Sequence, residues 1–160
     1  MEYYELPQPE EISKKEREDA MGAYLMMFAS IGAGLPFPII NLIAAVIYYF
    51  VNRKKGRFVK FHSYQSLISQ LPTTLLNAIT LSWVIRNLIN QVDFDQAFFG
   101  FLTAVIVTNI AYFVFSIIGA VKAKKGQMYY LFFFGRLSYI KAYKIKEDDD
   151  RVFENKPPVL

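Results

Sequence analysis

The chain has 160 residues, of which 54% are hydrophobic, 17% aromatic and 20% charged, and its formal net charge is +4. A soluble domain carries about 25% charged residues. Here the charges gather near the two ends, and only eight lie between Ala20 and Val121. This distribution excludes intrinsic disorder and predicts an all-α membrane protein. The chain has no cysteine and one histidine, His62, which excludes disulfides, cysteine nucleophiles and zinc sites with several histidines.

Residues 1–19 are polar and acidic, and they predict a cytoplasmic tail ahead of a membrane domain over 20–126. The tail lacks the basic start and early apolar run of a cleavable signal peptide. Ser13 followed by Glu16 predicts a capping box for a helix that leads into the first apolar stretch.

Residues 20–51 carry no charge, but glycines and prolines interrupt them between Gly32 and Pro38. Two short helices, over 21–34 and 38–52, are therefore predicted to form a hairpin. Each is about 22 Å long at 1.5 Å per residue, which is less than the roughly 30 Å hydrocarbon core. The hairpin either crosses a thinned bilayer or enters and leaves on the same side.

A long helix is predicted over 61–90, continuing through Pro72, with polar residues spaced so that they share one face. A cleaner apolar helix is predicted over 97–121, with a matching polar face. These polar residues are candidates for packing, for contact with a partner or for lining a path. They are Ser63, Ser66, Gln70, Thr73, Asn77, Thr80, Asn87, Asn109, Tyr112 and Ser116.

Arg86 is the one cation inside a predicted span, and it lies close enough to the end to reach the interface, with Asp93 or Asp95 as a partner. Residues 127–140 are aromatic and flanked by cations, which predicts a segment at the headgroup boundary. Residues 141–160 are predicted to form a second polar cytoplasmic tail.

Four spans would place 17 of the 18 Lys and Arg residues on one side of the membrane. Since positive residues stay cytoplasmic during insertion, the protein is predicted to lie in a bacterial inner membrane with both termini inside. Anionic lipid headgroups are the predicted partners of the basic residues, and nucleic acid is not. The candidate headgroup ligands are Arg53, Lys54, Lys55, Arg57, Lys60, Lys122, Lys124 and Lys125.

The stretch Phe58–Leu67, which reads FVKFHSYQSL, resembles the hallmark of a family of small four-span bacterial membrane proteins of unassigned function. That family is similar to the small multispan subunit of the plastid inner-envelope import translocon. Leu35-Pro36 with Asn41, and Ile118–Gly126 followed by paired tyrosines, also agree with it. The motif makes Phe61, His62 and Gln65 candidate functional residues. Phe132–Phe134 depart from the family, whose members tend to carry a proline there.

The resemblance implies a four-segment transmembrane bundle associated with protein translocation or membrane insertion machinery. The sequence has no catalytic motif, metal site or cofactor site, so a non-enzymatic subunit is expected, in complex with other membrane proteins or with itself. The alternative is an oligomeric channel or small-solute permease lined by the polar face of the helix over 61–90. For His62, the position at a helix start predicts a cap or an interfacial hydrogen bond, and a proton-sensing role is the other possibility.

Overall fold

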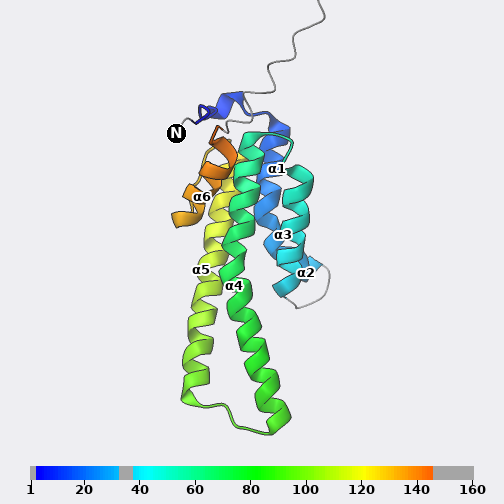
Figure 1. Ribbon diagram of the computed structural model, residues 1–160, viewed down its shortest axis with the longest axis vertical. Helices are drawn as coiled ribbons and strands as arrows, with labels where there is room; N and C mark the ends of the chain where they lie inside the picture. The colour runs from blue at the N-terminus through cyan, green and yellow to red at the C-terminus, as the bar shows by residue number, and fades with distance from the viewer. Residues whose placement is uncertain (1–2, 33–37, 146–160) are drawn as a thin grey trace, which may run out of the picture.

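The computed structural model describes residues 3–32 and 38–145, which form an all-helical fold (Figure 1). Short 3-10 turns, η1 and η2, precede α1 and α2. The elements are η1 (Pro9–Glu11), α1 (Lys14–Leu25), η2 (Met26–Phe28), α2 (Ala29–Gly32), α3 (Pro38–Asn52), α4 (Arg57–Asn90), α5 (Gln96–Lys124) and α6 (Phe132–Tyr143). Within the described residues, extended pairing is confined to one isolated bridge between Tyr3 and Lys144. The predicted all-α class is confirmed.

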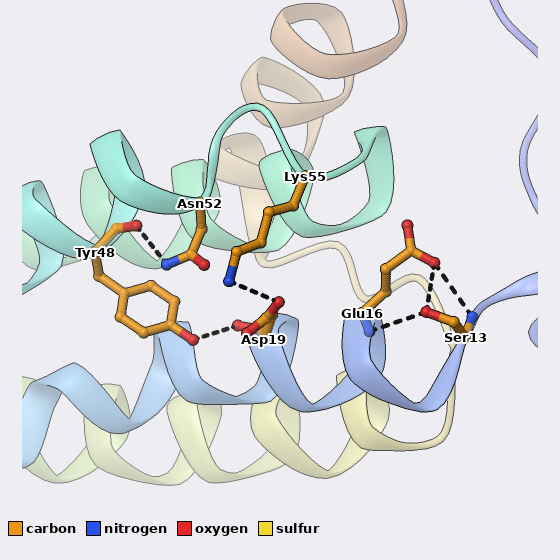
Figure 2. A network of polar contacts seen from close by, with 6 residues as sticks. All are labelled: Ser13, Glu16, Asp19, Tyr48, Asn52 and Lys55. Carbon is orange, nitrogen blue, oxygen red and sulfur yellow. Dashed lines mark hydrogen bonds and ion pairs between the residues drawn. The ribbon is translucent and has the colours of Figure 1, made fainter.

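The capping box predicted at the start of the first helix is present. Ser13 Oγ accepts a hydrogen bond from the Glu16 backbone N–H at 3.2 Å, and Glu16 Oε2 accepts one from the Ser13 N–H at 3.2 Å (Figure 2). These bonds satisfy two backbone donors that would otherwise lack partners at a helix start. The helix therefore begins at Lys14, earlier than the predicted start at 21.

The described ends of the chain lie together at one end of the molecule. The Tyr4 backbone N–H donates to the Tyr143 carbonyl oxygen at 2.9 Å, beside the bridge between Tyr3 and Lys144. The Ile12 side chain is buried in a small core with residues of α1, α4 and α5. The segment before α1 is therefore packed on the helices rather than fully solvated, because its few apolar side chains find apolar partners there.

The first hairpin consists of two arms that pack side by side through polar contacts near the ends of the chain (Figure 2). The Tyr48 hydroxyl on α3 donates to the Asp19 backbone oxygen on α1 at 2.8 Å. Lys55 Nζ lies 2.9 Å from the Asp19 carboxylate. Gly22 allows this approach, because a Cβ at that position would overlap the Tyr48 hydroxyl.

The two arms differ from each other in regularity. The second arm, α3, matches the helix predicted over 38–52. The first arm changes to a 3-10 turn at Met26–Phe28 before the short helix α2, so it is not one straight helix over 21–34. The connection over 33–37, which includes Leu35 and Pro36 of the resemblance, lies outside the described residues.

The helices α4 and α5 form a long antiparallel hairpin (Figure 1). With 34 and 29 residues, they are about 51 and 44 Å long at 1.5 Å per residue. As predicted, α4 continues through Pro72. It ends at Asn90, and the following residue, Gln91, adopts a left-handed φ of 53°. The next helix then starts from Asp95, whose carboxylate accepts a hydrogen bond from the Phe98 N–H at 2.8 Å.

Other helices cover only the half of the α4–α5 hairpin that lies nearest the chain ends (Figure 1). α1 packs on α4 and α5, whereas α3 and α6 pack on α4. The ring centroids of Tyr49 and Tyr64 are 5.5 Å apart, and those of Phe28 and Phe113 are 5.7 Å apart. Beyond the level of α2 and the start of α3, the other half consists of α4 and α5 alone among the described elements (Figure 1).

The exposure pattern is the reverse of that in a water-soluble protein. Gln70 on α4 is 2% exposed, whereas Leu75 and Ile110 are 62% and 59% exposed. Many other large apolar side chains on α3, α4 and α5 also face outward. Such extensive apolar surface indicates contact with lipid or with another protein.

Four complete membrane crossings are not confirmed. Of the described helices, α5 alone is long and apolar enough to cross a bilayer by length and composition. Ile39–Asn52 is apolar but shorter, and η2 interrupts the first arm. The helix α4 carries a polar face that lowers its mean hydropathy. The structure therefore supports a membrane-associated helical protein with one clear membrane-spanning candidate.

After α5, the chain reverses at Gly126. This residue adopts a left-handed φ of 73°, and its N–H donates to the Ala123 carbonyl oxygen at 2.9 Å. The Gln127 N–H donates to the Lys122 carbonyl oxygen at 3.0 Å, which is a typical glycine-dependent helix ending. A Cβ at position 126 would lie 3.1 Å from the Pro9 carbonyl oxygen.

The aromatic segment predicted over 127–140 forms the helix α6 at a slightly later position. Its exposed Phe132 and Phe133 side chains face outward. The helix extends to Tyr143, beyond the predicted start of the C-terminal tail at 141. This extension follows from the contact of Ala142 and Tyr143 with Phe61 in a second small core.

We expect Gly126→Ala to destabilise the protein by about 1–2 kcal/mol, because an L side chain is strained in the left-handed region. The new Cβ would also press on the Pro9 carbonyl group. Thermal unfolding in detergent measures this loss. Gly126→Asn should recover part of it, since asparagine tolerates this backbone conformation. Equal stability of Gly126→Ala and the unmodified protein would contradict the expectation.

Candidate functional site

The core at the covered end is organised by a hydrogen-bond network around Gln65 of α4. Gln65 Nε2 donates to the Tyr24 hydroxyl oxygen at 2.8 Å and to the Tyr129 carbonyl oxygen at 2.9 Å. Gln65 Oε1 accepts from the Leu131 N–H at 3.3 Å. The Tyr24 hydroxyl lies 2.9 Å from His62 Nδ1. This "Gln65 network", made of these five residues, connects α1, α4 and the segment between α5 and α6.

The three motif residues, Phe61, His62 and Gln65, are all fully buried. The His62 ring is 4.5 Å from the Phe58 ring and 5.7 Å from the Tyr24 ring, measured between centroids. His62 is therefore a buried hydrogen-bonding residue inside α4, which begins at Arg57, and not the helix cap that its expected position suggested. The motif residues hold helices together in this structure, and no open surface of the described chain reaches them.

Below the Gln65 network, a polar cavity of about 240 Å³ lies between α4, α5 and the first hairpin. We call this space the polar cavity. Its residues are Met27, Phe28, Asn41, Gln70, Thr73, Thr74, Asn77, Asn109, Tyr112 and Phe113. Five of the candidates named from the sequence therefore meet at one place. Its exposed lining is uncharged and more apolar than polar, so it suits a largely apolar group that carries a neutral hydrogen-bonding atom.

An amide pair closes one side of the polar cavity. Asn77 Nδ2 donates to Asn109 Oδ1 at 3.0 Å, and Asn109 Nδ2 donates back to Asn77 Oδ1 at 3.2 Å. Each amide also donates to its own helix, to the Thr73 and Val105 carbonyl oxygens. The structure thus brings together the two polar faces that the sequence placed on separate helices.

Other polar atoms of the cavity have no partner. Gln70 is buried, and neither its Nε2 nor its Oε1 forms a hydrogen bond with another described residue. The Tyr112 hydroxyl also lacks a hydrogen bond of good geometry, although it lies close to the side chains of Gln70, Ser66, Ser69 and Ser116. A buried polar group without a partner costs about 1–3 kcal/mol. The residues that line the polar cavity therefore carry buried donors and acceptors that the described chain does not fully satisfy.

The remaining predicted polar residues do not line the cavity. The Ser66 hydroxyl donates to the Ala23 carbonyl oxygen at 2.7 Å, which fixes α1 on α4. Ser63 is buried beside His62. Thr80 donates to the Leu76 carbonyl oxygen of its own helix, and Asn87 contacts the Asp93 carbonyl oxygen at 3.4 Å. The polar face is thus divided by contacts and is not one continuous path within a single chain.

Arg86 lies exposed near the far end of the α4–α5 hairpin, where reaching a membrane interface is easy. In the described structure it forms no ion pair with Asp93 or Asp95, the partners considered from sequence. The Asp95 carboxylate instead caps α5. Trp83 packs against Phe98 at 5.6 Å between centroids, which places aromatic rings at this end as in an interfacial belt.

The predicted headgroup ligands occupy two different surfaces. Lys122, Lys124 and Lys125 are exposed at the end of α5. The residues between Arg53 and Lys60 lie at the turn from α3 to α4. Of these, Lys55 forms an ion pair with Asp19 on α1, so its ammonium group is engaged within the protein (Figure 2). Burial raises the pKa of the nearby Tyr143 hydroxyl, which therefore stays neutral.

A buried polar interior under exposed apolar helix faces defines the class: a small, helical, membrane-associated protein. Residues 15–138 match the model of the MamF/MmsF family, described as the magnetosome magnetite crystal formation protein family. The chain belongs to this family. The predicted kinship with a small bacterial membrane protein family is confirmed at that level, and no link to a translocon subunit is found.

No curated protein and no solved structure matches the chain. The residues missed by sequence reasoning are Tyr24, Tyr129 and Leu131, which complete the Gln65 network. The sequence indicated only that Tyr24 lies within a predicted apolar helix. Nothing in its spacing pointed to Gln65.

Proposed function

We propose that this protein is a non-enzymatic integral subunit of a membrane assembly, and that it receives a transmembrane helix of its partner at the polar cavity. The observation that carries this proposal is the pair of buried side chains Gln70 and Tyr112, which lie close together but whose polar atoms form no hydrogen bond of good geometry among the described residues. Hydrocarbon offers no hydrogen bonds, so a polar group at membrane depth needs a protein partner or trapped water. A polar side chain on a neighbouring helix would supply one.

The embedding that we propose has α4 and α5 crossing the bilayer while the first hairpin enters only part of the way. Several observations support it. The arms of the hairpin end at the level of the polar cavity, since Met27 and Asn41 both line it. The described ends of the chain, at Tyr3 and Lys144, and the turn between α3 and α4 share one end of the molecule. That end carries most of the cations, which favours the cytoplasmic side.

The family description, magnetite crystal formation, enters as part of this proposal: the assembly would belong to a magnetosome-type membrane. Within the described residues, no group of three or more His, Cys, Asp or Glu side chains could hold a metal ion. The role that we propose therefore rests on packing and hydrogen bonding. Association with translocation or insertion machinery stays a prediction supported by the motif resemblance alone.

The test is recovery of the complex from native membranes in mild detergent. Gln70→Leu should reduce the partner recovered per protein about fivefold, because one interhelical hydrogen bond contributes about 1 kcal/mol. Thr103→Leu is the matched control, since Thr103 is exposed on α5 and bonds to its own helix. An unmodified protein that co-purifies with nothing, neither a partner nor a second copy, would contradict the proposal.

A second candidate function is an oligomeric permease for a small neutral solute, which the uncharged lining of the polar cavity favours. Because contacts of Ser66 and Gln65 close the polar face toward the chain ends, a path would have to form between copies. Reconstituted vesicles should then take up the solute, and Asn77→Leu should lower the flux. Absence of flux in sealed vesicles would exclude this function.

A further inference from the structure

A second cavity, of about 410 Å³, lies at the end of the molecule that holds the chain ends. Among the described residues that line it, six carry a positive charge and none a negative charge. The lining residues are Tyr4, Arg53, Lys54, Gly56, Arg57, Lys60, Lys141, Ala142 and Lys144. We call this cavity the basic cleft.

Two segments distant in sequence supply its cations. Four come from the turn between α3 and α4 and from the first turn of α4, and two come from the end of α6. The contact of α6 with α4 holds them together, with Phe61 and Tyr143 ring centroids 6.5 Å apart. The Arg57 guanidinium lies 3.4 Å from the centroid of the Tyr4 ring, which fixes one wall.

The basic residues that the sequence alone predicts as headgroup ligands near the turn from α3 to α4 differ from those that line the basic cleft. The predicted set includes Lys55, which the structure removes from the cleft through the ion pair with Asp19. It omits Lys141 and Lys144, which the fold of α6 brings to the cleft. The cleft is therefore a three-dimensional site and not simply a run of basic residues.

Six cations facing one concave space repel each other. The Glu16 carboxylate lies beside Gly56 at the edge of the cleft, but it is bonded to Ser13 and is one negative charge against six positive ones. Arginine binds phosphate through two parallel hydrogen bonds, and lysine binds it as a point charge. A volume of this size accepts a headgroup or a small polyphosphate. We propose that the basic cleft binds a phosphate-bearing anion, for which the phosphodiester headgroup of an acidic membrane lipid is the source best placed.

The position of the cleft supports the lipid source. It lies at the end where the apolar residues of α3 give way to the cations Arg53 and Lys54. In the embedding proposed above, this is the level of the cytoplasmic headgroups, where basic clusters attract anionic lipids. The exposed Phe50 ring lies 4.8 Å from the Arg53 guanidinium and would face the adjoining acyl chains.

The first arm of the experiment uses the full chain in nanodiscs that contain phosphatidylglycerol and phosphatidylcholine. After delipidation, native mass spectrometry measures how much of each lipid the protein retains. A second arm adds pyrophosphate to detergent-solubilised protein and follows binding by calorimetry. The cleft variant is Lys141→Gln with Lys144→Gln. The matched control is Lys122→Gln with Lys124→Gln, which removes the same charge from the end of α5, outside the cleft.

We expect the cleft variant to lose phosphatidylglycerol retention at least about tenfold, since each cation near an anionic surface contributes about fivefold. The control should lose much less. If the protein binds phosphatidylglycerol but not pyrophosphate, the ligand of the basic cleft is a lipid headgroup. If the basic cleft also binds pyrophosphate, a soluble phosphate is a further source of the ligand. Equal losses in the two double variants, or no preference for phosphatidylglycerol and no pyrophosphate binding, would overturn the proposal. Neither result bears on the polar cavity, so the two proposals fail independently.

Discussion

Replacing Gln65 by leucine is expected to destabilise the protein by about 2–4 kcal/mol, because each of two backbone groups left without a partner costs about 1–3 kcal/mol. These groups are the Tyr129 carbonyl and the Leu131 N–H, whereas the Tyr24 hydroxyl loses one bond and keeps His62 Nδ1 at 2.9 Å. Leucine has a similar volume, so the loss reports hydrogen bonding more than packing. Thermal unfolding in detergent, followed by circular dichroism, measures the change.

A second readout separates this network from a general loss of stability. Since Gln65 connects α4 to the segment before α6, hydrogen–deuterium exchange should rise first over 129–143. Gln96→Leu is the control, because Gln96 is exposed at the start of α5 and surface changes usually stay within about 0.5 kcal/mol. If Gln65→Leu unfolded at the same temperature as this control, the Gln65 network would not stabilise the fold.

Gly119→Ala is expected to separate α1 from α5 and to cost about 2–3 kcal/mol, in the range of overpacked cores. Gly119 is buried, and a Cβ there would lie 2.7 Å from Tyr24 Cε1 and 2.9 Å from Cζ. The ring cannot retreat easily, because its hydroxyl group is held by Gln65 and lies beside His62. The measurement is again thermal unfolding in detergent.

The same helix offers the opposite case at Gly100. A Cβ added to this residue of α5 would have no neighbouring atom of the described structure within 4 Å. Gly100→Ala should therefore be neutral or stabilise by up to about 1 kcal/mol through helix propensity. A single substitution type thus gives effects of opposite sign at two positions of one helix. Destabilisation of equal size at both positions would show that the contact between Gly119 and Tyr24 is not the cause.

Helix periodicity predicted much of the fold because its geometry is local. The 3.6-residue repeat determined which side chains of α4 share a face, and Asn77 does meet Asn109 across the hairpin. The Ser13 and Glu16 capping box depends on residues three apart, so it too was readable. Apolar composition identified α5 and α3, although it did not establish how far each arm enters a membrane.

The parts of the site that could not be predicted depend on long-range contacts. Tyr24 and Gln65 are far apart in sequence, and neither spacing nor composition links them. The motif containing Gln65 therefore suggested function, whereas the structure gives it a stabilising role. Likewise, charge counting cannot tell that Lys55 pairs with Asp19 while Lys141 joins the basic cleft.

The uneven covering of the α4–α5 hairpin has a mechanical consequence. In the proposed embedding, α1 and α3 accompany the hairpin through one leaflet, whereas α4 and α5 are the only described helices in the other (Figure 1). The protein then displaces more lipid area from the cytoplasmic leaflet and resembles a wedge. A wedge of this orientation fits best in a bilayer that is convex toward the cytoplasm, so the same chain should concentrate where the membrane bends that way.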